Sequence, residues 1–128
     1  LNSYFVKGTL TGEEMHLAHS ASDFTISRAG TGTIFEIAQK GVPAILIPIP
    51  EDISHDQRSN AYAYARAGAC SVMEEANLTD GLLTAEITRI MTDPGLYKDM
   101  ASAAAAFSSG DAADTIANTL TEIALEHV

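Results

Sequence analysis

The sequence predicts an α/β fold in which helices cover both faces of a parallel sheet. Short apolar runs alternate along the chain with segments of helical periodicity, as in strands joined by right-handed crossovers. The run at 44–47 is continuously apolar, which is typical of a strand buried on both faces. A glycine-rich turn also lies between one apolar run and the next helical one, where such folds often bind anions.

The first half of the chain is expected to hold three strands and two helices. The strands are expected at 4–6, 24–27 and 44–47, and the helices at 13–20 and 31–40. In the second helix, Ile34, Ile37 and Ala38 recur on one face, and Gly41 suits the residue after its last turn. Pro48 follows the third strand and should end it.

The second half is expected to hold one more strand and four helices. The strand is expected at 69–73, and the helices at 56–67, 79–92, 94–110 and 111–127. Gly68 ends the first of these helices, Thr79 is a suitable N-cap, and Pro94 suits a first helical position. The loops that follow the four strands should share one edge of the sheet, where ligands bind in this fold class. These loops are expected at 8–12, 28–33, 48–55 and 74–78.

Bulk properties exclude several function classes. The chain has 128 residues, enough for one ordinary domain, and a formal net charge of −10, which argues against general binding to nucleic acid or to an anionic membrane. Cys70 is the one cysteine, and His16 and His19 lack a third ligand, so no metal site is expected. The longest apolar run, 42–49, is too short to span a bilayer, and no signal-peptide pattern is visible. The single cysteine fits a reducing cytoplasm.

The glycine-rich turn is the strongest candidate site. Its sequence, SRAGTGTIFE at 27–36, lets the backbone approach a phosphate at the positive end of a helix. Glu36 stands one turn into that helix and could accept ribose hydroxyls. Alternatively, Thr33 and Glu36 could form a capping box. Arg28 could contact a phosphate or form a structural ion pair.

A second candidate site opens the helix after Pro48. Asp56 and Gln57 place a carboxylate beside an amide, which matches a pair of pyranose hydroxyls, and Asn60 follows one turn later. In the alternative interpretation, Asp56 only suits the helix dipole and Asn60 is a solvated surface residue. The acidic pairs at 51–52 and 74–75 are expected to be solvated loop charge.

The string SRAGTGTIFEIAQKGVPAILIP at 27–48 resembles the donor-nucleotide half of MurG-like glycosyltransferases, a branch of family 28 in the GT-B superfamily. The resemblance extends from about Val6 to Asn118. It implies that 1–128 is a single Rossmann-like nucleotide-sugar-binding domain, the C-terminal half of a GT-B fold without its first strands. Since Leu1 is not preceded by methionine, we expect a fragment of a longer chain. Enzymes of this family move N-acetylglucosamine from UDP to a lipid-linked peptidoglycan precursor.

The resemblance also implies roles for individual residues. It places Thr11 and Gly12 at the uracil edge and Glu36 at the ribose, while 29–33 line the diphosphate and 56–57 face the sugar. The expected UDP-sugar-binding residues are Thr11, Gly12, Arg28, Ala29, Gly30, Thr31, Gly32, Thr33, Glu36, Asp56, Gln57 and Asn60. Two departures from the family pattern are present: the order His55-Asp56-Gln57 replaces the usual Asp-His-Gln, and Gly12 replaces a bulkier apolar residue.

No catalytic residue, metal or cofactor is expected within this chain. In the family the candidate base and the lipid-linked acceptor belong to the N-terminal domain, so the fragment should be inactive alone, and the whole protein should work in the cytoplasm, peripherally at the inner face of the membrane. Two alternatives stay open. One is a nucleotide-sugar-binding subunit that works with a separate acceptor-binding chain. The other is a GT-B transferase with a different lipid or small-molecule acceptor.

Overall fold

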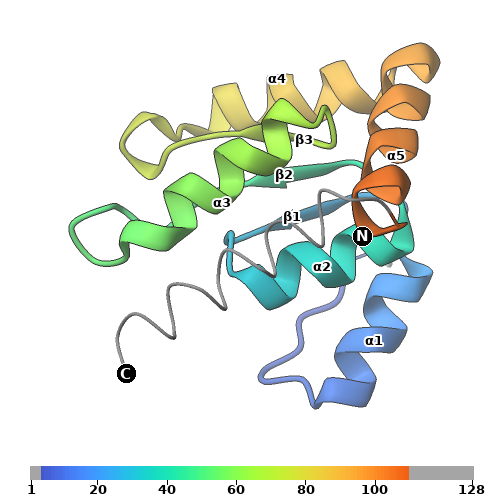
Figure 1. The fold of residues 1–128 in the computed structure, drawn as a ribbon, viewed down its shortest axis with the longest axis horizontal. Helices are drawn as coiled ribbons and strands as arrows, with labels where there is room; N and C mark the ends of the chain where they lie inside the picture. The colour runs from blue at the N-terminus through green and yellow to red at the C-terminus, as the bar shows by residue number, and fades with distance from the viewer. Residues whose placement is uncertain (1–3, 110–128) are drawn as a thin grey trace.

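The computed structural model describes residues 4–109 and contains a parallel sheet with helices around it (Figure 1). The three strands, β1 (Thr25–Ser27), β2 (Ala44–Leu46) and β3 (Cys70–Val72), lie in the order β1-β2-β3. Ile26, Ile45 and Ser71 stand in register across the sheet. The predicted α/β class with a Rossmann-like parallel sheet is therefore confirmed.

Five helices surround this sheet within residues 4–109. They are α1 (Gly12–Ala21), α2 (Thr31–Lys40), α3 (His55–Arg66), α4 (Asp80–Met91) and α5 (Pro94–Ser109), with a short 3₁₀ turn η1 (Glu75–Asn77) after β3. All five were predicted with bounds that agree within two residues. The helix expected at 111–127 lies outside the described residues.

The central strand β2 separates two apolar clusters. Ala44 and Leu46 belong to the larger cluster, which fills the space between the sheet, α2, α3 and the second half of α5. Ile45 points to the other face and joins the smaller cluster under α4 and the start of α5. Since both faces of β2 are fully buried, its uninterrupted apolar sequence is explained.

Two aromatic rings pack against each other in the larger cluster, where α3 meets α5. The Tyr64 ring of α3 meets the Phe107 ring of α5 edge-on, with centroids 4.9 Å apart. The end of α2 approaches α5 through Gly41, whose left-handed φ of 72° favours glycine and whose N–H group closes the helix against the Ile37 carbonyl.

The strand expected at 4–6 is absent, and this prediction was wrong. Tyr4, Phe5 and Val6 form no regular structure, pair with no strand and are 79–84% exposed. Within residues 4–109 nothing pairs with the free edge of β1, so the three apolar residues have no ladder to join. In consequence, the loop at 8–12 does not leave the sheet edge; it leads into α1, which contains no buried residue.

Candidate functional site

Three loops leave the carboxyl ends of the strands on one side of the molecule, the left side of Figure 1. They lie at 28–30 after β1, at 47–54 after β2 and at 73–79 after β3, and we call them the rim loops. Three of the four loops expected at this edge are therefore brought together. The fourth, at 8–12, is carried instead by α1.

Gln57 ties the first two rim loops to each other. Its side-chain Oε1 accepts hydrogen bonds from the backbone N–H of Ala29, at 3.2 Å, and from that of Ile49, at 3.1 Å. Both lone pairs of the amide oxygen are thereby used, and the Nε2 amino group remains to meet a ligand. That amino group faces Gly30, where an added Cβ would lie 3.9 Å from it. The structure therefore gives Gln57 a supporting role that its sequence position did not reveal.

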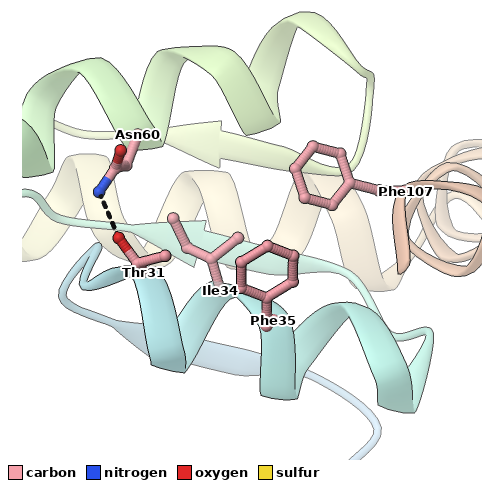
Figure 2. A pocket seen from close by; sticks show the side chains of 5 residues that line it. All are labelled: Thr31, Ile34, Phe35, Asn60 and Phe107. Atoms are coloured by element: carbon pink, nitrogen blue, oxygen red, sulfur yellow. Dashed lines mark hydrogen bonds between the residues drawn. The ribbon is translucent and has the colours of Figure 1, made fainter. Parts of the chain in front are cut away.

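Asn60 supports the same turn from one helical turn further along α3. Its Nδ2 donates to Thr31 Oγ1 at 3.1 Å, the dashed contact in Figure 2, and to the Ala29 carbonyl at 3.5 Å. The alternative interpretation of Asn60 as a solvated surface residue was wrong, because the side chain is half-buried and bonded. Asp56, in contrast, is exposed on the first turn of α3.

The N-terminus of α2 is left open by this arrangement. Gly30 is its N-cap, in an extended conformation, and provides no side-chain cap. A Cβ added at Gly32 would meet nothing within 4 Å, so the first turn borders open space. The capping box proposed for Thr33 and Glu36 was wrong, because the helix already begins at Thr31 and Thr33 lies inside its first turn. A helix end of this kind offers its N–H groups and its positive dipole end to an anion.

Arg28 forms the structural ion pair that was one of its two interpretations. Its Nη2 lies 3.1 Å from Glu75 Oε1 on η1, and its Nη1 donates to the carbonyls of Ile47, at 3.3 Å, and Pro48, at 3.5 Å. The guanidinium therefore connects all three rim loops. A phosphate contact would have to share it with these groups.

Arg58 forms a second set of ion pairs that the sequence did not reveal. Its Nε donates to Glu74 Oε1 at 2.5 Å, its Nη1 lies 3.5 Å from Glu51 Oε2, and its guanidinium stands 5.5 Å from the centre of the Tyr62 ring. The hydrogen bond that Arg58 donates to Glu74 raises the pKa of Arg58 above its usual range. The carboxylates at 51, 74 and 75 are partly exposed, as expected of loop charge, and each is in addition paired with an arginine.

An open pocket of about 350 Å³ lies between the last two rim loops. It is lined by Pro48, Ile49, Pro50, Glu51, Arg58, Glu74, Glu75 and Ala76. A second, much smaller hollow lies beside α2, where Thr31, Ile34, Phe35, Asn60 and Phe107 converge (Figure 2). Ile49 lines the larger pocket, and its N–H group donates to Gln57 Oε1. The same oxygen accepts from Ala29, so the Gln57 amide lies between the pocket and the turn at Gly30.

Glu36 lies further along α2, away from the strand ends and against α1. Its carboxylate Oε2 is 3.3 Å from Nε2 of His19, and 54% of its side chain is exposed. Thr11 and Gly12 begin α1: Thr11 forms a capping box with Glu14, in which the Thr11 hydroxyl accepts from Glu14 N and the Thr11 N–H donates to Glu14 Oε1. The expected site residues thus fall into two groups, one on the rim loops and one where α1 meets α2.

The thiol of Cys70 is unsuited to act as a nucleophile. Cys70 is buried in the larger cluster, and burial raises the pKa of its thiol to about 12. Residues 4–109 contain no group of three or more side chains that could hold a metal ion. Over the same part of the chain, no helix is long and apolar enough to cross a membrane.

An α/β domain with an open helix N-terminus at the carboxyl edge of a parallel sheet has the arrangement in which folds of this class commonly bind nucleotide-type anions. The model for the glycosyltransferase family 28 C-terminal domain matches residues 11–116, and the chain belongs to this family, in its MurG-like branch.

Individual relatives agree with this assignment. The chain is 38% identical to a protein of Mycobacterium ulcerans over 112 residues, which make up 88% of this chain. It is 40% identical to a protein of Sorangium cellulosum over 107 residues, which make up 84% of this chain. Both are named UDP-N-acetylglucosamine--N-acetylmuramyl-(pentapeptide) pyrophosphoryl-undecaprenol N-acetylglucosamine transferase. The crystal structure of Acinetobacter baumannii MurG superposes with a TM-score of 0.67, at 29% identity over 86% of this chain. The chain spans only 28%, 26% and 31% of these three proteins.

Proposed function

We propose that this chain is the donor-binding part of a hexosyltransferase that uses UDP-N-acetylglucosamine. The observation that carries the proposal is the uncapped N-terminus of α2 at Gly30, held against α3 by Gln57 and Asn60, in a domain of family 28. The names of the relatives support UDP-N-acetylglucosamine as the donor.

The diphosphate would bind the backbone N–H groups of the first turn of α2. In the transfer, an acceptor hydroxyl forms a bond to the anomeric carbon, the bond from that carbon to the β-phosphate oxygen breaks, and the electron pair leaves with UDP. The helix dipole and the N–H groups favour the negative charge that develops on this leaving group. The proton of the hydroxyl goes to a base outside this chain. In this proposal neither a metal nor a cofactor is required.

The residues on the rim loops and at the start of α3 would hold the sugar, and those where α1 meets α2 would hold the nucleoside. The free amino group of Gln57 would donate to a sugar oxygen, and the exposed carboxylate of Asp56 would accept from a hydroxyl. The carboxylate of Glu36 would accept from the ribose hydroxyls. Since Thr11 already bonds Glu14 through both its N–H and its hydroxyl, the N–H of Gly12 is the group left to read the uracil edge.

The acceptor in this proposal is a lipid-linked hydroxyl, reached by the whole protein at the inner surface of the cell membrane. The names of the relatives support it, since they include a pyrophosphoryl-undecaprenol carrier. The acceptor-binding part would be supplied by a further domain or by a separate subunit.

Titration with UDP, ADP and GDP tests the nucleotide assignment. Backbone amide signals would be followed in the protein that carries this chain. We expect those of Gly30, Gly32 and Glu36 to shift more with UDP than with the purine nucleotides. For residues 1–128 alone, the dissociation constant for UDP is expected at about 1 mM, equivalent to roughly −4 kcal/mol. Gly41, at the other end of α2, is the internal control, and equal shifts at Gly41 and Gly30 would contradict the assignment.

A further inference from the structure

Within residues 4–109, the expected ribose carboxylate of Glu36 is paired with His19 of the neighbouring helix α1. His19 stands on the last turns of α1 and Glu36 on the second turn of α2, with Nε2 and Oε2 separated by 3.3 Å. No local pattern connects them, since they are 17 positions apart in the sequence, and His19 was considered only as a metal ligand.

The two partners differ in how firmly they are held. Only 13% of the His19 side chain is exposed, against 54% of that of Glu36. The end of α1 is also fixed to α2 by Lys40, whose Nζ donates to the Ser20 carbonyl at 2.5 Å. The imidazole is therefore the anchored partner, and the carboxylate, at the end of a flexible side chain, is the partner that is oriented.

We propose that His19 is a positioning residue for the donor nucleotide: it holds the Glu36 carboxylate in the orientation that accepts the ribose hydroxyls. This inference rests on the proposed function. A carboxylate has about four lone-pair positions, so a contact of one oxygen with the imidazole leaves others for a vicinal diol. Holding the side chain in place before binding lowers the conformational cost that the nucleotide would otherwise meet.

The test compares UDP with 2′-deoxy-UDP, because their affinities differ only through the hydroxyl that Glu36 is proposed to bind. The ratio of the dissociation constant of 2′-deoxy-UDP to that of UDP is measured in the whole protein that carries this chain. Glu36→Gln should reduce the ratio. His19→Phe keeps the ring and its packing but removes both nitrogens, and we expect it to reduce the ratio about threefold to tenfold, equivalent to roughly 0.6–1.4 kcal/mol.

The double variant and a matched control complete the test. In a Glu36→Gln background, His19→Phe should change the ratio no further, since its effect passes through the carboxylate. His16→Ala alters the exposed histidine on the same helix and should leave the ratio unchanged. A steady-state readout should show His19→Phe raising the donor KM while kcat is retained.

The outcomes separate the two proposals. If Glu36→Gln lowers the ratio and His19→Phe does not, the inference about His19 is overturned while the ribose assignment stands. If Glu36→Gln leaves the ratio unchanged, the ribose assignment itself fails. A His19→Phe effect that persists in the Glu36→Gln background would show that His19 acts on the fold or on another contact, and would also overturn the inference.

Discussion

The rim loops and α1 carry the two halves of the proposed donor site, and they are held in different ways. The rim loops are joined by side chains of α3 and by Arg28, through hydrogen bonds to backbone groups that are far apart in the sequence. Helix α1 has no buried residue and is held by its own capping box and by contacts with α2. The proposed diphosphate end is thus joined to the core helices α2 and α3, whereas the proposed base end rests on the peripheral helix α1, which contacts Glu36 of α2 through His19.

The largest expected contrast is in packing. Ile37 of α2 is fully buried, whereas Leu17 of α1 is 61% exposed. Ile37→Ala should lower the free energy of unfolding by about 2–5 kcal/mol, because it removes buried methyl groups and leaves a cavity. Leu17→Ala should change it by less than about 0.5 kcal/mol. Urea unfolding of both variants checks the contrast, and equal losses would show that α1 is part of the core.

The second contrast lies within Gln57. Gln57→Ala leaves the N–H groups of Ala29 and Ile49 without their acceptor and should cost about 1–3 kcal/mol of stability. Gln57→Glu keeps an oxygen for both N–H groups but removes the amino group. We expect the second variant to unfold nearly like the unsubstituted protein. Its added negative charge lies beside the turn at Gly30, so UDP should bind more weakly. The UDP-sugar should lose more affinity than UDP, because it also loses its contact with the amino group. Equal loss of UDP and UDP-sugar affinity would place the amino group away from the sugar.

The smallest expected effect is the acid sensitivity of α1. A hydrogen bond from the Thr11 backbone N–H, with further ones from Lys7 and the Thr11 hydroxyl, lowers the pKa of Glu14 below its ordinary value of 4.5. A carboxyl whose pKa is lower in the folded state stabilises that state above its unfolded pKa, and this contribution is lost as the pH falls through the folded pKa.

Amide exchange over that acid range measures this effect. Protection at Glu14 and Met15 should decrease below pH 4.5, while that of the amides of β2 should not change over the same range. Glu14→Gln, which removes the titrating carboxyl and keeps an oxygen for the Thr11 N–H, should abolish most of this pH dependence. Exchange at Met15 that is independent of pH in both proteins would contradict the prediction.

Elements with a repeated apolar pattern could be predicted from the sequence, and isolated patterns could not. The helix at 31–40 combined a periodic apolar face with Gly41 at its end, and it was predicted correctly. The apolar triplet at 4–6 matched a strand locally, but a strand also needs a pairing partner, which three residues cannot indicate.

The capping box shows the same limit at a smaller scale. Within residues 4–109 the Thr-x-x-Glu pattern occurs at 11–14 and again at 33–36, and of these two only the first forms a cap. The two differ in where the helix starts: Thr11 precedes its helix, whereas Gly30 takes the N-cap position before Thr33 is reached. The pattern itself contains no information about that choice.

The contacts that define the candidate site are the least predictable part. Glu75 is 47 residues from Arg28, and Glu74 is 16 residues from Arg58, so no local pattern connects the partners. One signal was available: in a parallel sheet, charged residues that follow neighbouring strands share an edge, and Arg28 and Glu75 both do so. The oxygen of Gln57 could not have been assigned to two backbone N–H groups without the coordinates.

The central strand has a consequence for how the domain opens. Because β2 provides Ala44 and Leu46 to one cluster and Ile45 to the other, neither cluster can lose its strand without exposing its neighbour. Partial opening that spares half of the domain is therefore costly, and the two clusters should melt as one cooperative unit. The amides of β2 should then exchange only through global unfolding, at a rate set by the stability of the entire domain.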